Sequence, residues 1–106
     1  MNFNLQSIVS KMNNNELELN KQREKKYQGF VNQVDEVIRD INGDMLLNLK
    51  RLQVSREDKN LKPLTDFIVE RLDNLQKRED KAKDLKSSLV DQLKQIRINI
   101  QNLEVK

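Results

Sequence analysis

Residues 61–105 read LKPLTDFIVERLDNLQKREDKAKDLKSSLVDQLKQIRINIQNLEV, and this stretch carries the clearest pattern in the chain. Every seventh residue of it is apolar: Leu61, Ile68, Leu75, Ala82, Leu89, Ile96 and Leu103. A second apolar set, in which Glu79 stands in place of one member, consists of Leu64, Leu72, Leu85, Leu93 and Ile100. The combined steps of three and four residues average about 3.5, the period of a coiled coil rather than of a straight helix. The pattern predicts a long heptad-bearing helix over residues 63–105.

The segment before this helix interrupts the apolar pattern. Six consecutive residues, 55–60, carry no apolar side chain. Pro63 follows, and proline fits only the first turn of a helix because it has no amide hydrogen. We therefore expect a connection over residues 55–62.

A first long helix is predicted over residues 16–54. Its apolar positions follow steps of three and four residues: Tyr27, Phe30, Val34, Val37, Ile38, Ile41, Met45, Leu49 and Leu52. Asn42-Gly43 could form a hairpin turn, but the apolar positions continue in phase across it, from Ile41 to Met45. We expect a continuous or slightly kinked helix, because one interior glycine costs only about 1 kcal/mol.

Residues 1–15 form a leader that is predicted to be flexible or a short helix. Three asparagines, Asn13 to Asn15, have poor helix propensity, and Asn15 with Glu18 has the form of a capping box at the start of the long helix. The apolar leader residues could instead form a partner-binding or membrane-surface helix, and they are Phe3, Leu5, Ile8, Val9 and Met12.

The composition restricts the classes of function. Only 36% of the residues are hydrophobic against 35% charged, which favours long solvated helices over a globular core. The net charge of +3 is spread along the chain, and the most basic block, residues 21–26, contains Glu24, so nucleic acid is not an expected partner. We expect Tyr27, Phe30 and Phe67 to lie between the helices rather than to stack on bases.

Residues suited to catalysis or metal binding are scarce. The chain has no cysteine and no histidine, and its two glycines, Gly29 and Gly43, cannot form a phosphate-binding loop. We expect no catalytic residue, no cofactor, no metal site and no small-molecule substrate. The longest apolar runs are three residues long, so neither a transmembrane segment nor a secretory signal is expected. These features favour a cytoplasmic location.

Together the patterns predict an all-α fold in which two long amphipathic helices form a helical hairpin or coiled coil. One such hairpin buries little apolar surface compared with the entropy lost on folding. We therefore expect other coiled-coil subunits as partners, in a hetero-oligomer, with a homo-oligomeric structural coiled coil as the alternative. The predicted partner-interface residues are Val34, Ile38, Ile41, Met45, Leu49, Leu52, Leu61, Leu64, Ile68, Leu72, Leu75, Leu85, Leu89, Leu93, Ile96, Ile100 and Leu103.

The start of the second helix resembles a known family. Leu61-Lys62-Pro63-Leu64-Thr65-Asp66-Phe67, followed by Glu70-Arg71-Leu72 and Leu75, is similar to the snapin-like small subunits of the yeast complex related to biogenesis of lysosome-related organelles. The resemblance covers about residues 30–95. It implies a cytoplasmic, endosome-associated adaptor that bundles with other small helical subunits and helps to recruit regulators of endosome maturation. Small helical subunits of the fungal microtubule-binding kinetochore ring have a similar pattern and are the alternative.

Overall fold

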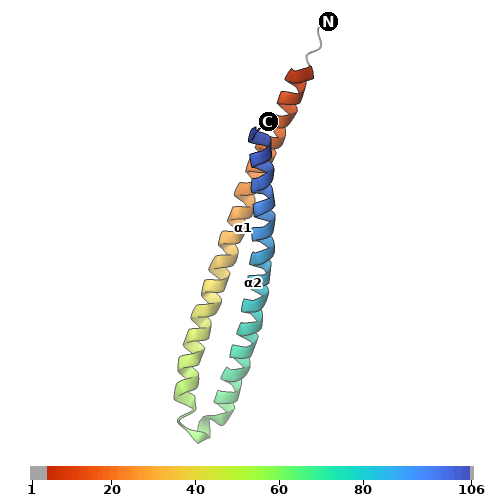
Figure 1. Ribbon diagram of the computed structural model, residues 1–106. Coiled ribbons are helices and arrows are strands. Elements are labelled where there is room, and N and C mark those ends of the chain that lie inside the picture. The colour runs from red at the N-terminus through yellow and green to blue at the C-terminus, as the bar shows by residue number, and fades with distance from the viewer. Residues whose placement is uncertain (1–4, 106) are drawn as a thin grey trace. The chain divides into compact units, whose positions relative to one another are not determined.

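The structure is a computed structural model that describes residues 5–105. It contains helix α1 (Leu5–Ser55), the short 3-10 helix η1 (Lys59–Leu61) and helix α2 (Lys62–Val105), and no strand among the described residues (Figure 1). The predicted all-α helical hairpin is confirmed. Both helices pass through two compact units. We call residues 33–87 the turn unit, and residues 5–32 with 88–105 the terminal unit.

Helix α1 begins earlier than the sequence predicts. The predicted start at residue 16 is wrong, because residues 5–15 belong to the same uninterrupted helix. Leu5, Val9, Asn13 and Leu17 line a groove together with Leu103 near the end of α2. Leu5, Val9 and Met12 are nevertheless more than half exposed. The helix continues through the asparagines because each residue added to a nucleated helix forms one more backbone hydrogen bond, which outweighs their low propensity. Residues 1–4, including Phe3, lie outside the described part of the chain.

The predicted continuity at Asn42-Gly43 is confirmed. Helix α1 runs through both residues, and no described residue has a positive φ. Helix α1 ends at Ser55 and α2 begins at Lys62, each one residue from the predicted bound, a difference that is common at helix ends. Pro63 is the second residue of α2, in the first turn as expected.

The polar connection satisfies the backbone groups that the helix ends leave free. Arg56 N donates to Leu52 O at 3.0 Å and closes α1. Asp58 caps η1, because its Oδ1 accepts from Asn60 N at 2.9 Å and its carbonyl accepts from Leu61 N at 3.0 Å. A segment without apolar residues thus forms a compact turn through hydrogen bonds rather than burial.

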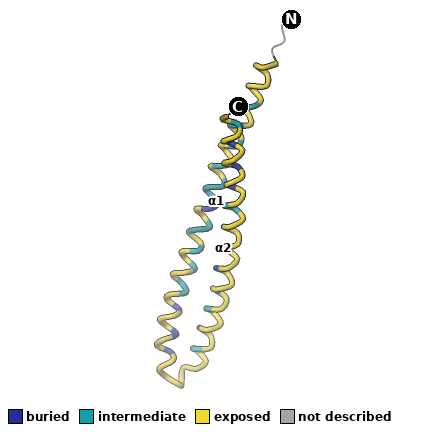
Figure 2. Tube along the Cα trace, in the orientation of Figure 1, coloured by how far each residue is buried: buried dark blue, intermediate teal, exposed yellow. Residues whose placement is uncertain are grey.

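Buried and half-buried positions repeat every seven residues along both helices of the turn unit. We call these positions the seam (Figure 2). On α1 they are Val34, Ile38, Ile41, Met45, Asn48, Leu52 and Ser55, and on α2 they are Thr65, Ile68, Leu72, Leu75, Glu79, Ala82 and Lys86. The terminal unit has its own seam, which consists of Asn13, Leu17, Asn20, Glu24, Tyr27, Val31, Leu89, Leu93, Ile96, Ile100 and Leu103. The first heptad set is therefore correctly predicted from Ile68 to Leu103, but its first member, Leu61, lies in η1 and is exposed.

The second heptad set of α2 is partly wrong. Leu64 and Leu85 are 46% and 53% exposed, while Thr65 and Lys86 occupy the seam in their place. Steps from one apolar residue to the next select Leu64 and Leu85, but a coiled-coil seam keeps a strict seven-residue repeat even where a polar residue falls on it. Lys86 fits there because its stem can lie along the helices while its Nζ pairs with Asp35 at 2.7 Å.

Candidate partner-binding surface

Hydrogen bonds and ion pairs fix the register of the two helices in the turn unit. Thr65 Oγ1 donates to Ser55 Oγ at 2.9 Å beside the connection. In an antiparallel pair, each step back along α1 matches one step forward along α2. The register therefore places Asn48 level with Leu72 and Ile41 level with Glu79. The ion pair between Asp35 and Lys86 fits the same register.

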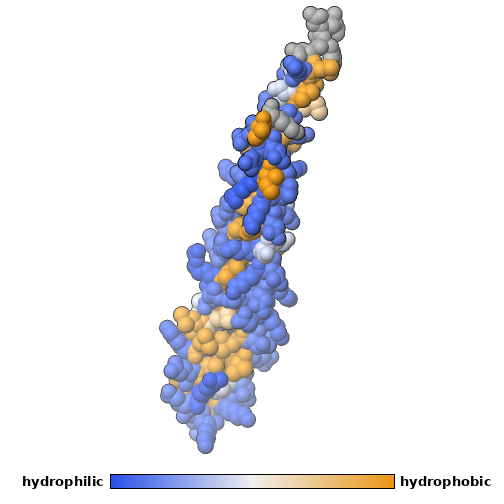
Figure 3. All heavy atoms as spheres, in the orientation of Figure 1, coloured by the Kyte–Doolittle hydropathy of each residue, from blue (hydrophilic) through white to orange (hydrophobic). Residues whose placement is uncertain are grey.

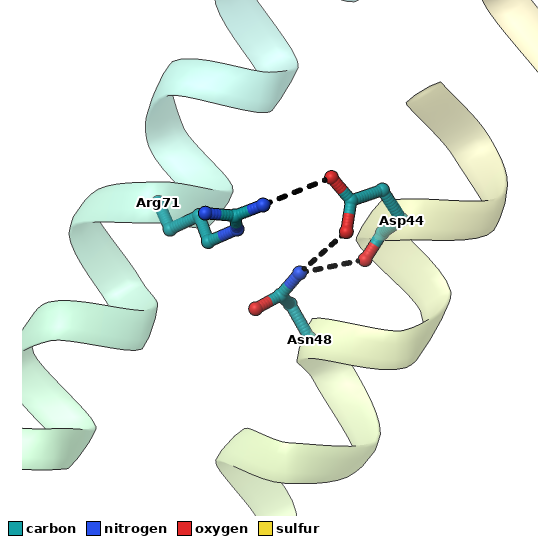
Figure 4. A network of polar contacts seen from close by, with 3 residues as sticks. All are labelled: Asp44, Asn48 and Arg71. Carbon is teal, nitrogen blue, oxygen red and sulfur yellow. Dashed lines mark hydrogen bonds and ion pairs between the residues drawn. The ribbon is translucent and has the colours of Figure 1, made fainter. Parts of the chain in front are cut away.

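A buried asparagine interrupts the apolar seam and bonds to Asp44 of its own helix, which in turn pairs with Arg71 of α2 (Figure 4). Asn48 is 1% exposed, and its Nδ2 donates to the Asp44 carbonyl at 2.8 Å and to Asp44 Oδ1 at 3.0 Å. Arg71 of α2 donates from its Nη2 to Asp44 Oδ2 at 3.3 Å. A polar residue at such a position lowers stability compared with leucine but favours one register. The prediction that Leu49 lies in the seam is wrong, because Asn48 occupies that position and Leu49 is exposed.

A buried carboxylate forms a second polar position in the seam. Glu79 Oε1 accepts from Lys83 Nζ at 2.9 Å. This hydrogen bond and the Glu79 charge raise the pKa of Lys83, with a smaller contribution from the charge of Asp80. The seam of the turn unit therefore contains a hydroxyl pair, an amide and a carboxylate where a self-sufficient coiled coil would carry aliphatic residues.

The predicted interface residues fall into three groups. Buried between the helices of their own unit are Leu52, Ile68, Leu75, Leu93, Ile96 and Ile100. Half-buried are Val34, Ile38, Ile41, Met45, Leu72, Leu89 and Leu103. Exposed are Leu49, Leu61, Leu64 and Leu85. Most of the predicted residues therefore pack the two helices against each other, and only the exposed group is readily accessible to a partner.

The structure reveals an exposed apolar surface in the turn unit. Leu64 and Phe67 each immediately precede a seam residue of α2, and Val54 immediately precedes Ser55 on α1. In antiparallel helices, residues that precede the seam lie on the same side of the pair. Accordingly, Val54, Leu64 and Phe67 line one groove with Leu61. We call these four residues the docking face, and Figure 3 shows a hydrophobic patch over the turn unit.

The docking face exposes large side chains. Phe67 is 62% exposed and Val54 is 66% exposed, so the prediction that Phe67 lies between the helices is wrong. Phe30 is also exposed, at 37%, whereas Tyr27 is half-buried as predicted. Val54 and Phe67 each stand one residue before a seam position. This position identifies them as surface residues once the polar seam residues are assigned.

Neither a membrane span nor a metal cluster is found in the described residues. Within 5–105, no helix has the length and hydropathy needed to cross a membrane. Over the same range, no three histidine, cysteine, aspartate or glutamate side chains gather as a metal site would require. No family model, curated protein or solved structure matches the chain.

Proposed function

We propose that the chain is a non-enzymatic coiled-coil subunit of a multi-subunit helical complex, and that another subunit binds the docking face. The exposure of Phe67 beside Leu64, Leu61 and Val54 is the observation that carries this proposal. Apolar side chains that face water do not gain the free energy of burial. Contiguous exposed apolar patches on a protein therefore mark sites of protein interaction.

The polar seam supports the same conclusion. Asn48 and Glu79 are buried, yet each contributes less to the apolar core than an aliphatic residue would. A pair of helices with such a seam gains limited stability from its own contacts. A third or fourth helix on the docking face would add the missing apolar burial.

The resemblance to snapin-like subunits extends the proposal to an endosomal adaptor that acts in endosome maturation and vesicle trafficking. This extension is supported by the sequence of residues 61–75. We propose on this basis that the complex acts in the cytoplasm at endosomes. The long paired helices of the structure are compatible with such a subunit.

The test compares two aspartate substitutions in α2. Phe67→Asp places a charge in the docking face, whereas Val69→Asp changes an exposed residue that follows the seam and lies on the other side of the pair. Each tagged variant is purified from the protein's own cells, and the mass of its complex is measured. We expect Phe67→Asp to lose the partner subunits and Val69→Asp to retain them, with equal helicity by circular dichroism.

Substitutions within the seams do not provide this test. Ile96 is buried between the helices of the terminal unit, so Ile96→Asp would disrupt the pair itself as well as any assembly. If the unmodified chain is a monomer in its cells, or if Phe67→Asp retains every partner, the proposed function is wrong.

A further inference from the structure

We infer that the occupant of the docking face is an amphipathic helix of a different protein chain, with acidic residues beside its apolar stripe. This inference rests on the proposed function and specifies the chemistry of the partner. Three properties of the groove support it: its apolar floor, its charge and the consequence of that charge for self-association.

The floor of the groove has the form that receives a helix. Leu61 of η1 is followed at three-residue steps by Leu64 and Phe67 of α2, and Val54 lines the same groove from α1. Apolar ridges with this spacing interlock with the ridges of another helix. A helix whose apolar residues recur at three- and four-residue steps would fill the groove.

The charge of the groove is positive. Lys50, Arg51 and Arg71 line it, and no acidic residue does. Arg71 is paired with Asp44 at 3.3 Å, but neither Lys50 nor Arg51 forms an ion pair with any residue of the described range 5–105. A partner that covers two unpaired cations without supplying carboxylates would pay their desolvation cost. Acidic residues beside the apolar stripe of the partner helix would pair with these cations, which offsets the desolvation cost and speeds association.

The same charge argues against a second copy of this chain. A symmetric contact between two copies places the same patch on both sides. Lys50, Arg51 and Arg71 of one copy would then lie near the same cations of the other. Like charges at an interface weaken binding, so a different chain with Asp or Glu is the better fit.

The test uses the full chain and two designed helical peptides of about three heptads. Both peptides carry leucine on one face; one has glutamate on the flanks of this face and the other has lysine. Binding is measured by calorimetry at low salt and again at higher salt. We expect the glutamate peptide to bind about tenfold more tightly than the lysine peptide, and the difference to shrink as salt screens the charges.

Charge reversal in the groove should invert this preference. In the double variant Lys50→Glu/Arg51→Glu, the lysine peptide should bind more tightly than the glutamate peptide. Arg39→Glu is the matched control, because Arg39 is an exposed α1 arginine that follows a seam residue and lies on the other side of the pair. It should keep the preference of the unmodified chain. Phe67→Ala should weaken binding of both peptides.

Each other result would overturn the inference in a distinguishable way. Equal binding of both peptides would reject the acidic partner but leave the docking face and the proposed function in place. Self-association that Phe67→Asp abolishes, measured by sedimentation equilibrium, would make a second copy the occupant. No binding of either peptide would reject a helical occupant, and if the native complex also survives Phe67→Asp, the proposed function fails as well.

Discussion

Thr65 and Ser55 share a hydrogen bond across the connection between the two helices. Thr65 Oγ1 donates to Ser55 Oγ at 2.9 Å, and Ser55 Oγ donates in turn to Leu52 O at 3.1 Å. Ser55 is buried, so its hydroxyl has little access to water as an alternative partner. This contact joins the last residue of α1 to the first turn of α2 and therefore sets the register from which the rest of the turn unit follows.

Removing the Thr65 hydroxyl should weaken the turn unit. Thr65→Val keeps the shape of the side chain but leaves Ser55 Oγ without its donor, which should lower the free energy of unfolding by about 1 kcal/mol. Thr65→Ser retains the hydroxyl and should cost less. Urea unfolding monitored by circular dichroism measures both variants. If Thr65→Val is as stable as the unmodified chain, the hydrogen bond does not contribute to the turn.

Leu93 and Leu85 should respond differently to truncation, although the sequence pattern placed both in one set. Leu93 is 3% exposed, so Leu93→Ala should lower the free energy of unfolding by about 2–5 kcal/mol. Leu85 is exposed, and Leu85→Ala should change it by less than about 0.5 kcal/mol. Equal losses, measured by urea unfolding, would show that Leu85 belongs to the seam.

The fold could be predicted from the sequence because it depends on repeated features. The strict column from Ile68 to Leu103 indicates a long helix, and the position of Pro63 and the apolar gap at residues 55–60 each indicate the turn before it. Whether a segment is helical depends on many residues together, so a few polar residues at apolar positions do not change the prediction. Local propensity alone misses the start of α1, because a long nucleated helix continues through a few residues of low propensity.

The docking face could not be predicted, because apolarity alone does not show which side of a helix a residue occupies. Leu64 and Thr65 are neighbours in sequence, and an apolar rule selects Leu64 for the seam. In the structure Thr65 occupies the seam instead, because its hydroxyl donates a hydrogen bond to Ser55 of α1 and its position keeps the seven-residue repeat. Likewise, Asn48 is buried in the seam, whereas its apolar neighbour Leu49 is exposed. Polar seam residues therefore have to be assigned first, and the exposed apolar residues then become recognisable as a surface.

Replacing Gly43 by alanine should stabilise the chain. Gly43 lies inside α1 without a positive φ, and a Cβ built on it would meet nothing within 4 Å. Alanine loses less conformational entropy than glycine in a helix, so Gly43→Ala should raise the free energy of unfolding by up to about 1 kcal/mol. Gly29→Ala, where the space is equally open, should act in the same direction. A loss of stability in thermal unfolding would contradict the continuous helix at residue 43.

Neutralising Glu79 should lower the pKa of Lys83. In the unmodified chain, the hydrogen bond to Glu79 and the charge of Glu79 raise the pKa of Lys83 above the ordinary value of 10.5. Glu79→Gln removes the charge, so the Lys83 pKa should return toward that value in an NMR titration of the lysine side chain. Asp73→Asn, which removes the partner of Lys77 instead, should leave the Lys83 titration unchanged.

The direction of this shift determines how the ion pair affects stability with pH. Because the folded chain holds the Lys83 proton more tightly than the unfolded chain, the stabilisation is complete below pH 10.5 and is lost as the pH rises through the folded-state pKa. This pair should therefore add no pH dependence near neutrality. At alkaline pH, the stability of the unmodified chain should fall more steeply than that of Glu79→Gln. Identical slopes, together with an unchanged Lys83 pKa, would show that the ion pair does not form in solution.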